Sequence, residues 1–350
     1  LISTASFGQW EKLIKKDLSN WVQLNGTAPY EIKDGVITGT TVIDSPNSFL
    51  CSKVSYGDFI LEFETWFDSR MNSGVQIRSE SKPDYQNGRV HGYQIEMDPS
   101  DRAWSGGIYD EARRGWLYTL DINPEGRKAF KKDDWNNYRI EAIGNSIRTW
   151  VNGIPCADLV DDMTLSGFIA LQVHSIGKDK AREGLVVKWR NIRIVTKNVS
   201  KYATPYKPVI PQVSYLTNQL TEREKSEGWK LLWDGKSSSG WRSVRSKSFP
   251  ETGWEIKDGM ITVQSKEEQP KRGGDIVTVE KYRSFELVVD FRYPKGGNSG
   301  IKYFIGPENA KGVISTVGCE YQVLDDRNHP DAKAGRDGNR TLAGLYDLIP

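Results

Sequence analysis

The sequence predicts an all-β protein made of two β-sandwich domains, and three observations support this. The pentapeptide Glu-Ile-Lys-Asp-Gly at residues 31–35 recurs at 255–259, and the triplet Asn-Ser-Gly at 72–74 recurs at 298–300. Repeats in this order, far longer than the roughly 20–50 residues of a solenoid unit, indicate two copies of one domain. The chain also shows frequent period-2 alternation of apolar and polar residues. Its 33 Gly, 12 Trp and 15 Tyr are typical of β-sheets that carry aromatic surfaces.

The predicted strands of the first copy follow one another at short intervals. Turn signals separate them, notably Asp34-Gly35, Gly144-Asn145 and Asn152-Gly153, and the last of these predicts a tight hairpin. Many short strands at this spacing indicate a sandwich. The segments with the clearest alternation are 59–67, 74–78, 93–98, 137–142, 146–151, 168–174 and 185–195.

The repeat also predicts the domain boundaries. Residues 1–196 are expected to form a complete domain, and residues 197–222, with Pro205, Pro208 and Pro211, a linker. Residues 223–350 are expected to form the front part of a second domain of the same kind, since Gly-Ile-Tyr-Asp at 107–110 returns as Gly-Leu-Tyr-Asp only at 344–347. Thr221 to Lys225 resembles a capped helical turn that leads into this second copy.

Charge and cysteine content narrow the class of protein. There are 48 Lys and Arg against 46 Asp and Glu, without a basic run, which disfavours a nucleic-acid partner. No apolar stretch approaches the roughly 20 residues of a membrane span. Cys51, Cys156 and Cys319 are too few for a disulfide framework. Cys51 and Cys156 could pair, but two buried free thiols are the favoured interpretation.

A larger set of motifs resembles the DUF1080 family, also named the 3-keto-disaccharide hydrolase family. In the first copy these are the residues at 72–78, 91–98, 104–110, 135–138 and 167–174, and in the second those at 228–236, 298–300, 320–326, 329–330 and 343–347. The resemblance implies tandem concanavalin A/laminin G-like jelly rolls, a sugar or glycoside substrate, and a secreted or periplasmic location. It also implies chemistry on glycosides that carry a ketone at C3. Such a ketone acidifies the C2–H bond, so a base can form an enolate and the C1 aglycone can leave.

Strand alternation then predicts which side chains face the substrate. Residues two apart on a strand share a face, and relatives of this fold use the polar face of the front sheet as the sugar cleft. The candidates on three strands are Gln76 and Arg78, then Gln94, Glu96 and Asp98, then Gln172 and His174. A merely solvated face is the alternative interpretation.

Glu96, Asp98 and His174 are the candidate catalytic residues. Two acids on one strand face lie roughly 6.6 Å apart along the strand and repel each other mildly, which favours a functional role for Glu96 as base or acid. His174 is suited to proton transfer near neutral pH or to metal binding. The sequence identifies no cofactor with certainty, and a divalent metal stays open, including a calcium site formed by Glu96, Asp98 and Asp101.

The loop at 102–116 supplies further candidates for binding. Arg102, Trp104, Tyr109 and Arg113 could stack on sugar rings or bind oxygens, with Arg78 and Arg113 stabilising the oxyanion. A well-packed Ω-loop is the alternative. In the second copy the equivalent candidates are Glu320, Gln322, Asp325 and His329. The sequence therefore favours an enzyme that cleaves a 3-keto-glycoside or a related disaccharide by hydrolysis or elimination. A non-catalytic, lectin-like module is the alternative.

Overall fold

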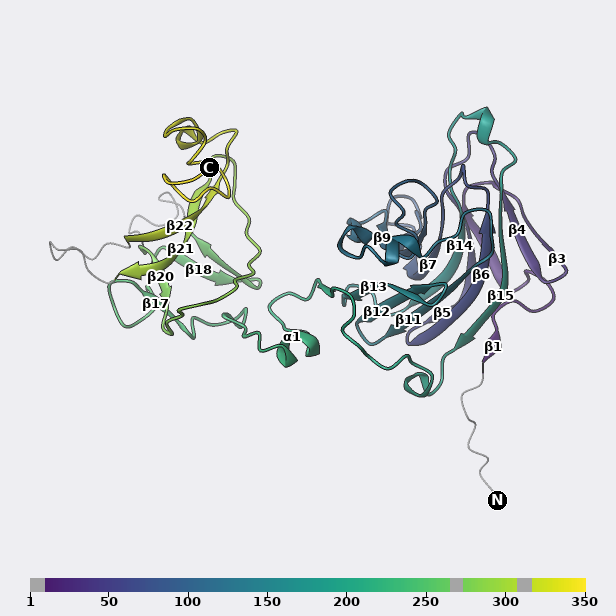
Figure 1. The fold of residues 1–350 in the computed structure, drawn as a ribbon, viewed down its shortest axis with the longest axis horizontal. Coiled ribbons are helices and arrows are strands. Elements are labelled where there is room, and N and C mark those ends of the chain that lie inside the picture. The colour runs from purple at the N-terminus through teal and green to yellow at the C-terminus, as the bar shows by residue number, and fades with distance from the viewer. Residues whose placement is uncertain (1–9, 265–272, 307–316) are drawn as a thin grey trace, which may run out of the picture. The chain divides into compact units, whose positions relative to one another are not determined.

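A computed structural model describes residues 10–264, 273–306 and 317–350 (Figure 1). The chain divides into two compact units. The first contains the residues up to 216 together with 220–228, and the second contains residues 217–219 and 229–350.

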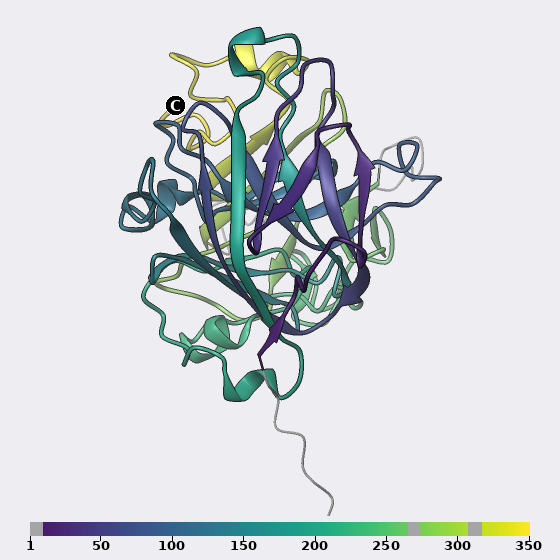
Figure 2. The same cartoon turned by 90° about the vertical axis from the view of Figure 1, so that its right-hand side faces the viewer.

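The first unit is a β-sandwich of two sheets. Its nine-stranded sheet has the order β16-β13-β12-β11-β6-β15-β4-β3, with β1 also paired to β15, and its seven-stranded sheet has the order β10-β9-β8-β7-β14-β5-β2. In Figure 2 the long strand β15 runs beside the N-terminal strands of the first of these sheets. The strands are β1 (Glu11–Lys12), β2 (Trp21–Asn25), β3 (Tyr30–Lys33), β4 (Val36–Thr40), β5 (Ser48–Tyr56), β6 (Phe59–Phe67), β7 (Ser73–Glu80), β8 (His91–Met97), β9 (Ile108–Glu111), β10 (Gly115–Tyr118), β11 (Asn136–Ile143), β12 (Ser146–Val151), β13 (Ile154–Val160), β14 (Gly167–Val173), β15 (Val186–Val195) and β16 (Val213–Ser214).

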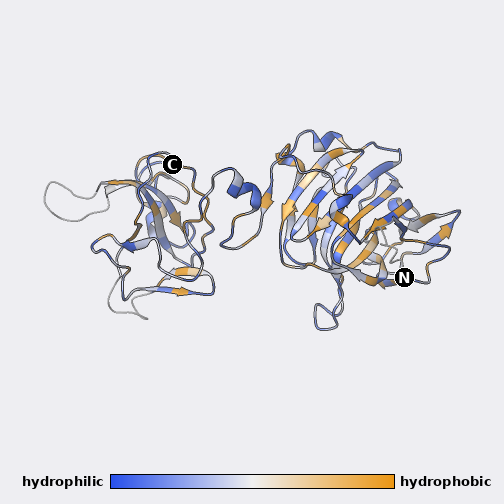
Figure 3. Cartoon of the chain, turned by 90° about the horizontal axis from the view of Figure 1, so that it is seen from below, coloured by the Kyte–Doolittle hydropathy of each residue, from blue (hydrophilic) through white to orange (hydrophobic). Residues whose placement is uncertain are grey.

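Alternation along the strands places the core between the two sheets. Val75 and Ile95 of the seven-stranded sheet pack in one buried cluster with Leu61, Ile140 and Trp189 of the nine-stranded sheet. Figure 3 shows apolar and polar residues alternating along these strands. The predicted all-β sandwich is confirmed, and the side chains between the core residues point away from it.

The predicted strands and turns of the first copy largely match the structure. β6 and β12 have the predicted bounds, and the other predicted strands differ by one or two residues at their ends. Asn152-Gly153 joins β12 to β13 with φ of 51° and 80°, the left-handed conformation that a tight hairpin needs at both positions. Short 3-10 helices η1 (Leu120–Ile122), η2 (Gly126–Lys128), η3 (Lys180–Arg182) and η4 (Val199–Lys201) lie in the connections.

The segment expected to be a linker packs on the first sandwich instead. β16 pairs in parallel with β13, and the Tyr118 hydroxyl donates to the Pro211 carbonyl at 2.8 Å. Further on, the capping box of Thr221 and Glu224 begins helix α1 (Glu222–Ser226), as the sequence predicted. Pro residues here shape an extended segment that binds the sandwich surface, which composition alone could not distinguish from a free tether.

A protein that ends at residue 228 should therefore be more stable than one that ends at residue 197. The shorter protein loses the pairing of β16 and the bonds that Arg139 and Arg148 donate to the carbonyls of Tyr202 and Thr204. We expect its free energy of unfolding to fall on the order of 3 kcal/mol, measured by urea denaturation. Equal stability of the two proteins would show that the packed segment contributes nothing.

The second unit carries three two-stranded sheets among its described residues. Its strands are β17 (Trp241–Ser243), β18 (Trp254–Lys257), β19 (Met260–Val263), β20 (Ile276–Thr278), β21 (Asn298–Gly306) and β22 (Val317–Leu324), followed by the 3-10 helix η5 (Pro330–Lys333). Val323 and Leu324 are buried, whereas Phe285, Val288 and Phe291 are exposed. These three exposed side chains lie in the segment between β20 and β21, whose described residues form no strand.

Two features predicted from composition can be compared with the fold. Cys51 and Cys156 are buried free thiols, as favoured, because Cys51 lies in a small cluster with Phe49 and Cys156 lies in the main core. Burial raises the pKa of the Cys156 thiol to about 12, so it stays protonated and unreactive near neutral pH. Among the described residues, no helix has the length and apolar character needed to cross a membrane.

Candidate functional site

Four neighbouring strands bring most of the predicted polar residues to the outer face of the seven-stranded sheet. In the register, Gln76 lies opposite Gln94 on β8, and Gln94 lies opposite Tyr109 on β9. Glu96 is two residues beyond Gln94 and faces the same way, while the intervening Ile95 enters the core. On β14, Gln172 follows the core residue Leu171 and points outward too.

Glu96 is the centre of this group. Its side chain is 3 % exposed, and one carboxylate oxygen accepts a hydrogen bond from the Asn72 amide while the other accepts from Gln94 Nε2 at 3.1 Å. Burial, with a smaller contribution from the Asp98 charge, raises the pKa of Glu96 to about 7. The hydrogen bonds from Asn72 and Gln94 and the Arg102 charge act in the opposite direction. A carboxyl group with a pKa near 7 can both accept and return a proton at neutral pH.

Asp98 is paired and does not share the position of Glu96. Its carboxylate accepts from Arg102 Nε and from the backbone N–H of Ser100, each at 3.0 Å. The Arg102 guanidinium in turn lies over the rings of Trp104 and Trp116, 4.9 and 5.4 Å from their centroids. Asp98 thus bonds the arginine that lies over the aromatic rings.

These rings form an aromatic cluster, defined here as Trp104, Tyr109 and Trp116. Trp116 makes edge-to-face contacts with Trp104 at 4.6 Å and with Tyr109 at 5.2 Å between centroids. All three are partly exposed. The cluster lies next to Glu96, since the backbone N–H of Glu96 donates to the Gly107 carbonyl and a Cβ at Gly107 would touch the Trp116 ring. Partly exposed aromatic rings beside a buried acid are suited to stacking on a sugar ring.

Gln172 has an unsatisfied amide. The side chain is fully buried, and neither its Nε2 nor its Oε1 has a hydrogen-bond partner. Such a group costs about 1–3 kcal/mol unless a ligand or water satisfies it. Gln172 lies in the same row as Glu96, across Gly74 of β7, so the orphaned amide and the acid belong to one site.

His174 follows the end of β14, and the structure does not bring it into contact with Glu96. Nδ1 of its ring lies 2.7 Å from the Ser175 carbonyl, within hydrogen-bond distance, whereas Glu96 is bonded to Asn72 and Gln94. The expected Glu96–His174 pair is thus not observed. His174 keeps the parity of Gln172, at the rim of the same face.

The expected placement of Arg78 is wrong. Arg78 has a φ of 46° at an irregularity where the β7–β8 register shifts, so its side chain leaves the face that carries Gln76. The guanidinium is fully buried and donates to the carbonyls of Gly57 and Gly144 at 3.0 and 2.7 Å. It ties two turns of the sandwich together and is not available to an oxyanion.

Arg113 is likewise held away from Glu96. Its guanidinium bonds Asp110 at 2.7 Å and Thr164 at 2.6 Å, and it lies 5.2 Å from the centroid of Tyr93. Tyr93 and Asp110 are register partners and belong to the core side of the sheet, opposite to Tyr109. Arg113 lies in the turn between β9 and β10 and points toward the side of Asp110, not toward the side of Tyr109 and Glu96. Residue spacing alone did not show this.

The second unit repeats the register with different side chains. Gly300 lies opposite Gln322 as Gly74 lies opposite Glu96, and Lys302 lies opposite Glu320 as Gln76 lies opposite Gln94. The Lys302 ammonium is 3.6 Å from the Glu320 carboxylate, and Gln322 is buried.

The other two candidates of the second unit have local partners. Asp325 accepts from the backbone N–H of Gly296 at 2.7 Å, and His329 Nδ1 accepts from the backbone N–H of Asp331 at the start of η5. Both side chains therefore stabilise turns of their own neighbourhood.

Three residues of the site were not among the sequence candidates. Asn72 binds Glu96, Ser79 binds Gln76, and Trp116 completes the aromatic cluster. The recurrence of Asn-Ser-Gly at 72–74 and 298–300 was the available signal for Asn72. Ser79 gave no signal, because its approach depends on the register shift of β7.

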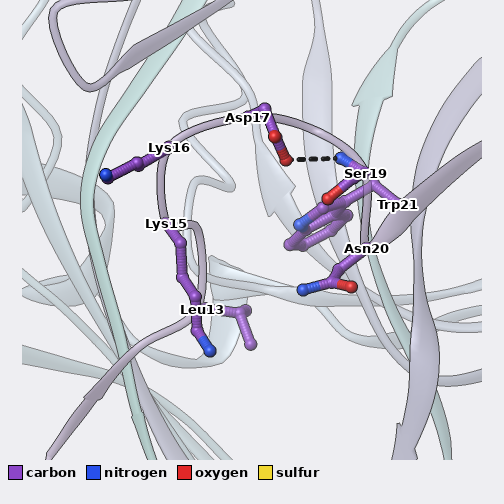
Figure 4. A pocket seen from close by; sticks show the side chains of 7 residues that line it. All are labelled: Leu13, Lys15, Lys16, Asp17, Ser19, Asn20 and Trp21. Carbon is purple, nitrogen blue, oxygen red and sulfur yellow. Dashed lines mark hydrogen bonds between the residues drawn. The ribbon is translucent and has the colours of Figure 1, made fainter.

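Two hollows of the surface lie away from this group of residues. One of about 290 Å³ is lined by residues between Leu13 and Trp21, including Lys15 and Lys16 (Figure 4). Another, of about 790 Å³, lies in the second unit around Asp234. The described residues hold no group of three or more His, Cys, Asp or Glu side chains placed to bind a metal.

The sequence was compared with known proteins and solved structures. A curated 3-keto-disaccharide hydrolase from Bacteroides thetaiotaomicron is 40% identical over 136 residues, which cover 36% of this chain and 47% of that protein. The chain thus spans about half the length of this relative.

Two solved structures illustrate the range of structural likeness. A carbohydrate-binding module from Bacillus subtilis covers 50% of this chain and 95% of its own, at 16% identity and a TM-score of 0.34. A β-1,3-1,4-glucanase from a mouse hindgut metagenome covers 53% and 97%, at 14% identity and a TM-score of 0.36.

A family match extends over most of the chain. It covers residues 9–195 and 228–350, which include Glu96 with its neighbours and the corresponding strands β21 and β22. The chain belongs to the family described as the 3-keto-alpha-glucoside-1,2-lyase-like domain.

Proposed function

We propose that the protein cleaves a glycosidic bond of a 3-keto-glycoside, or of a related disaccharide, and that Glu96 is the proton acceptor. The observation that carries the proposal is Glu96 itself, a buried carboxyl group with a pKa of about 7 that two amides hold in place beside an aromatic cluster. The 3-keto-disaccharide hydrolase that is 40% identical over 136 residues supports the substrate class.

The chemistry follows from the acidity of the sugar. The ketone at C3 stabilises the electron pair left when Glu96 removes the proton from C2, and an enolate forms. The enolate then collapses: the C3 ketone re-forms, and the electron pair becomes a double bond between C2 and C1. The bond from C1 to the aglycone oxygen breaks in this step. The proton held by Glu96 can then neutralise the departing oxygen. Addition of water at C1 completes hydrolysis, and omission of that step gives elimination.

The surrounding residues have matching roles in this proposal. The aromatic cluster stacks on the ring, and the free amide of Gln172 binds sugar oxygens that would otherwise leave it unsatisfied. Arg102, fixed between Asp98 and the rings, supplies positive charge near the site in place of Arg78 and Arg113. His174 at the rim would contact substrate rather than Glu96.

Turnover tests the proposal directly. The protein is incubated with a disaccharide oxidised at C3 and with its unoxidised parent, and monosaccharide release is measured. Release from the oxidised sugar alone is the expected result, because only the ketone makes the C2 proton acidic. If either sugar binds and neither is cleaved, the result would instead support a lectin-like module, which the partly exposed aromatic cluster would also suit.

The pH dependence of turnover should show the ionisation of Glu96. The base must be deprotonated, so kcat/KM should fall about tenfold for each pH unit below a midpoint near 7, the pKa of Glu96 in the fold. Measurement of kcat/KM between pH 4.5 and 9 locates this limb. A midpoint near 4.5, the ordinary value for glutamate, would contradict the buried site as the source of the base.

A further inference from the structure

We propose that Gln94, Gln76 and Ser79 are positioning residues that hold and orient Glu96 through a directed chain of hydrogen bonds. The inference rests on the proposed function, because it assigns these side chains to the control of the proton acceptor. It revises the expectation that Gln76 and Gln94 bind the sugar themselves.

The donors of this hydrogen-bond chain all point toward Glu96. The Ser79 hydroxyl donates to Gln76 Oε1 at 2.8 Å, Gln76 Nε2 donates to Gln94 Oε1 at 2.8 Å, and Gln94 Nε2 donates to Glu96 Oε2 at 3.1 Å. A carboxylate can only accept, so an ionised Glu96 requires Gln94 to present its NH₂ group. The Gln94 oxygen is then free to accept from Gln76, and the Gln76 oxygen to accept from Ser79. A protonated Glu96 no longer imposes this order, so the chain favours the ionised base.

Burial makes these bonds effective. Gln76 and Ser79 are at most 1 % exposed and Gln94 is 2 % exposed, so water does not compete for the amides. Gly74 provides the space, because a Cβ at that position would lie 2.5 Å from Cγ and Cδ of Gln94. The amide of Gln94 is therefore seated on β7 and aimed at Glu96.

The second unit shows the same register with the chemistry rearranged. There Glu320 occupies the place of Gln94, beside Lys302 in the place of Gln76, and Gln322 occupies the place of Glu96. In the second unit the middle position is therefore a carboxylate, Glu320, paired with the Lys302 cation, and the end position is the neutral amide Gln322. Only the first unit, whose end position is the acid Glu96, has two neutral amides in the positions before it.

Other titratable groups also lie near Glu96, and none of them is a member of this hydrogen-bond chain. Asp98 lies on the same strand side and Arg102 in the following loop, while Tyr109 of β9 and Tyr138 of β11 also feel the Glu96 charge. Gln94, Gln76 and Ser79 carry no charge, so replacing them removes hydrogen bonds without adding or removing a charge.

The test measures the Glu96 titration in the full chain by carboxyl ¹³C NMR, with its signal assigned by its loss in Glu96→Gln. We expect Gln94→Met to raise the midpoint of Glu96 by about one pH unit, the equivalent of one hydrogen bond to a charged group. Gln76→Met should raise it less and Ser79→Ala least. The acidic limb of kcat/KM should move in the same order. Gln94→Leu replaces the Met variant if that one does not fold.

Gln172→Met is the matched control, because it removes a buried amide of the same face that has no bond to the chain. Its Glu96 midpoint should equal that of the unmodified protein. An unchanged midpoint in Gln94→Met, or an equal rise in Gln172→Met, would overturn the proposal. If the midpoints follow the expected series while Glu96→Gln still releases sugar, the positioning chain stands and the proposed function fails.

Discussion

Glu96→Gln should lower kcat/KM on a 3-keto-disaccharide by about 10²–10⁴-fold, the usual contribution of a general base. The amide has the size of the carboxyl group but cannot accept the C2 proton. It can keep both hydrogen bonds, because its oxygen accepts from Gln94 while its NH₂ donates to an Asn72 amide that has turned over. Steady-state rates of sugar release would measure the loss.

Glu62→Gln is the matched control for this variant. Glu62 bonds Arg139 and Arg193 on the nine-stranded sheet, whereas Glu96 lies on the seven-stranded sheet. The activity of Glu62→Gln should therefore stay near that of the unmodified protein. Full activity in Glu96→Gln would refute its role as base. If Glu320→Gln lost activity in its place, the chemistry would belong to the second unit.

Stability provides a second readout of the same variant. The folded pKa of Glu96, about 7, lies above the unfolded value near 4.5. Its contribution to stability is therefore fully present below pH 4.5 and is lost as the pH rises through 7. Glu96→Gln has no such loss. Its free energy of unfolding at pH 8 should therefore exceed that of the unmodified protein by on the order of 3 kcal/mol, with little difference at pH 4.5. Urea denaturation at the two pH values compares them.

Gly167→Ala should destabilise the first sandwich by about 3 kcal/mol, at the upper end of the usual cost of overpacking. A Cβ at Gly167 would lie 2.4 Å from the backbone of Arg78 and Ser79, where β14 crosses the irregular part of β7. Backbone atoms cannot move aside as a side-chain end can, so the two strands must separate. Thermal or urea unfolding would measure the effect.

Gly57→Ala is the comparison for Gly167→Ala. Its Cβ would have an ordinary contact of 3.7 Å with the Leu165 carbonyl, and we expect a change within about 0.5 kcal/mol. Equal stability of the two variants would mean that strands β7 and β14 are not closely packed at this point. A displaced Ser79 in Gly167→Ala would also disturb the chain that ends at Glu96.

Regular alternation allowed the shared face of four candidate residues to be predicted. Gln76, Gln94, Glu96 and Gln172 share the outer face because the strands through them keep a period of two, with core residues between them. The sequence could not show which hydrogen bonds the side chains of this face make with one another. The bonds among Gln76, Gln94 and Glu96 depend on side chains from different strands meeting in register, which alternation within one strand does not specify.

The predictions that were wrong concern places where the period is interrupted. Arg78 has a left-handed φ at a register shift, and Arg113 lies in the turn between β9 and β10, where it bonds Asp110. The same limit applies to the segment after residue 196. Its prolines indicate extended backbone, but only long-range contacts, such as that of Tyr118 with Pro211, reveal that it packs on the sandwich.

The short strand β16 also affects how copies of the chain can associate. β13 would otherwise end the nine-stranded sheet with unpaired backbone groups at Leu159 and Val160, an invitation to pair with another chain. Val213 and Ser214 occupy these groups, and the nearby Pro211 has no N–H to offer to a further strand. The segment that leads from one unit to the next therefore also covers the end of this edge, where it disfavours pairing with another chain.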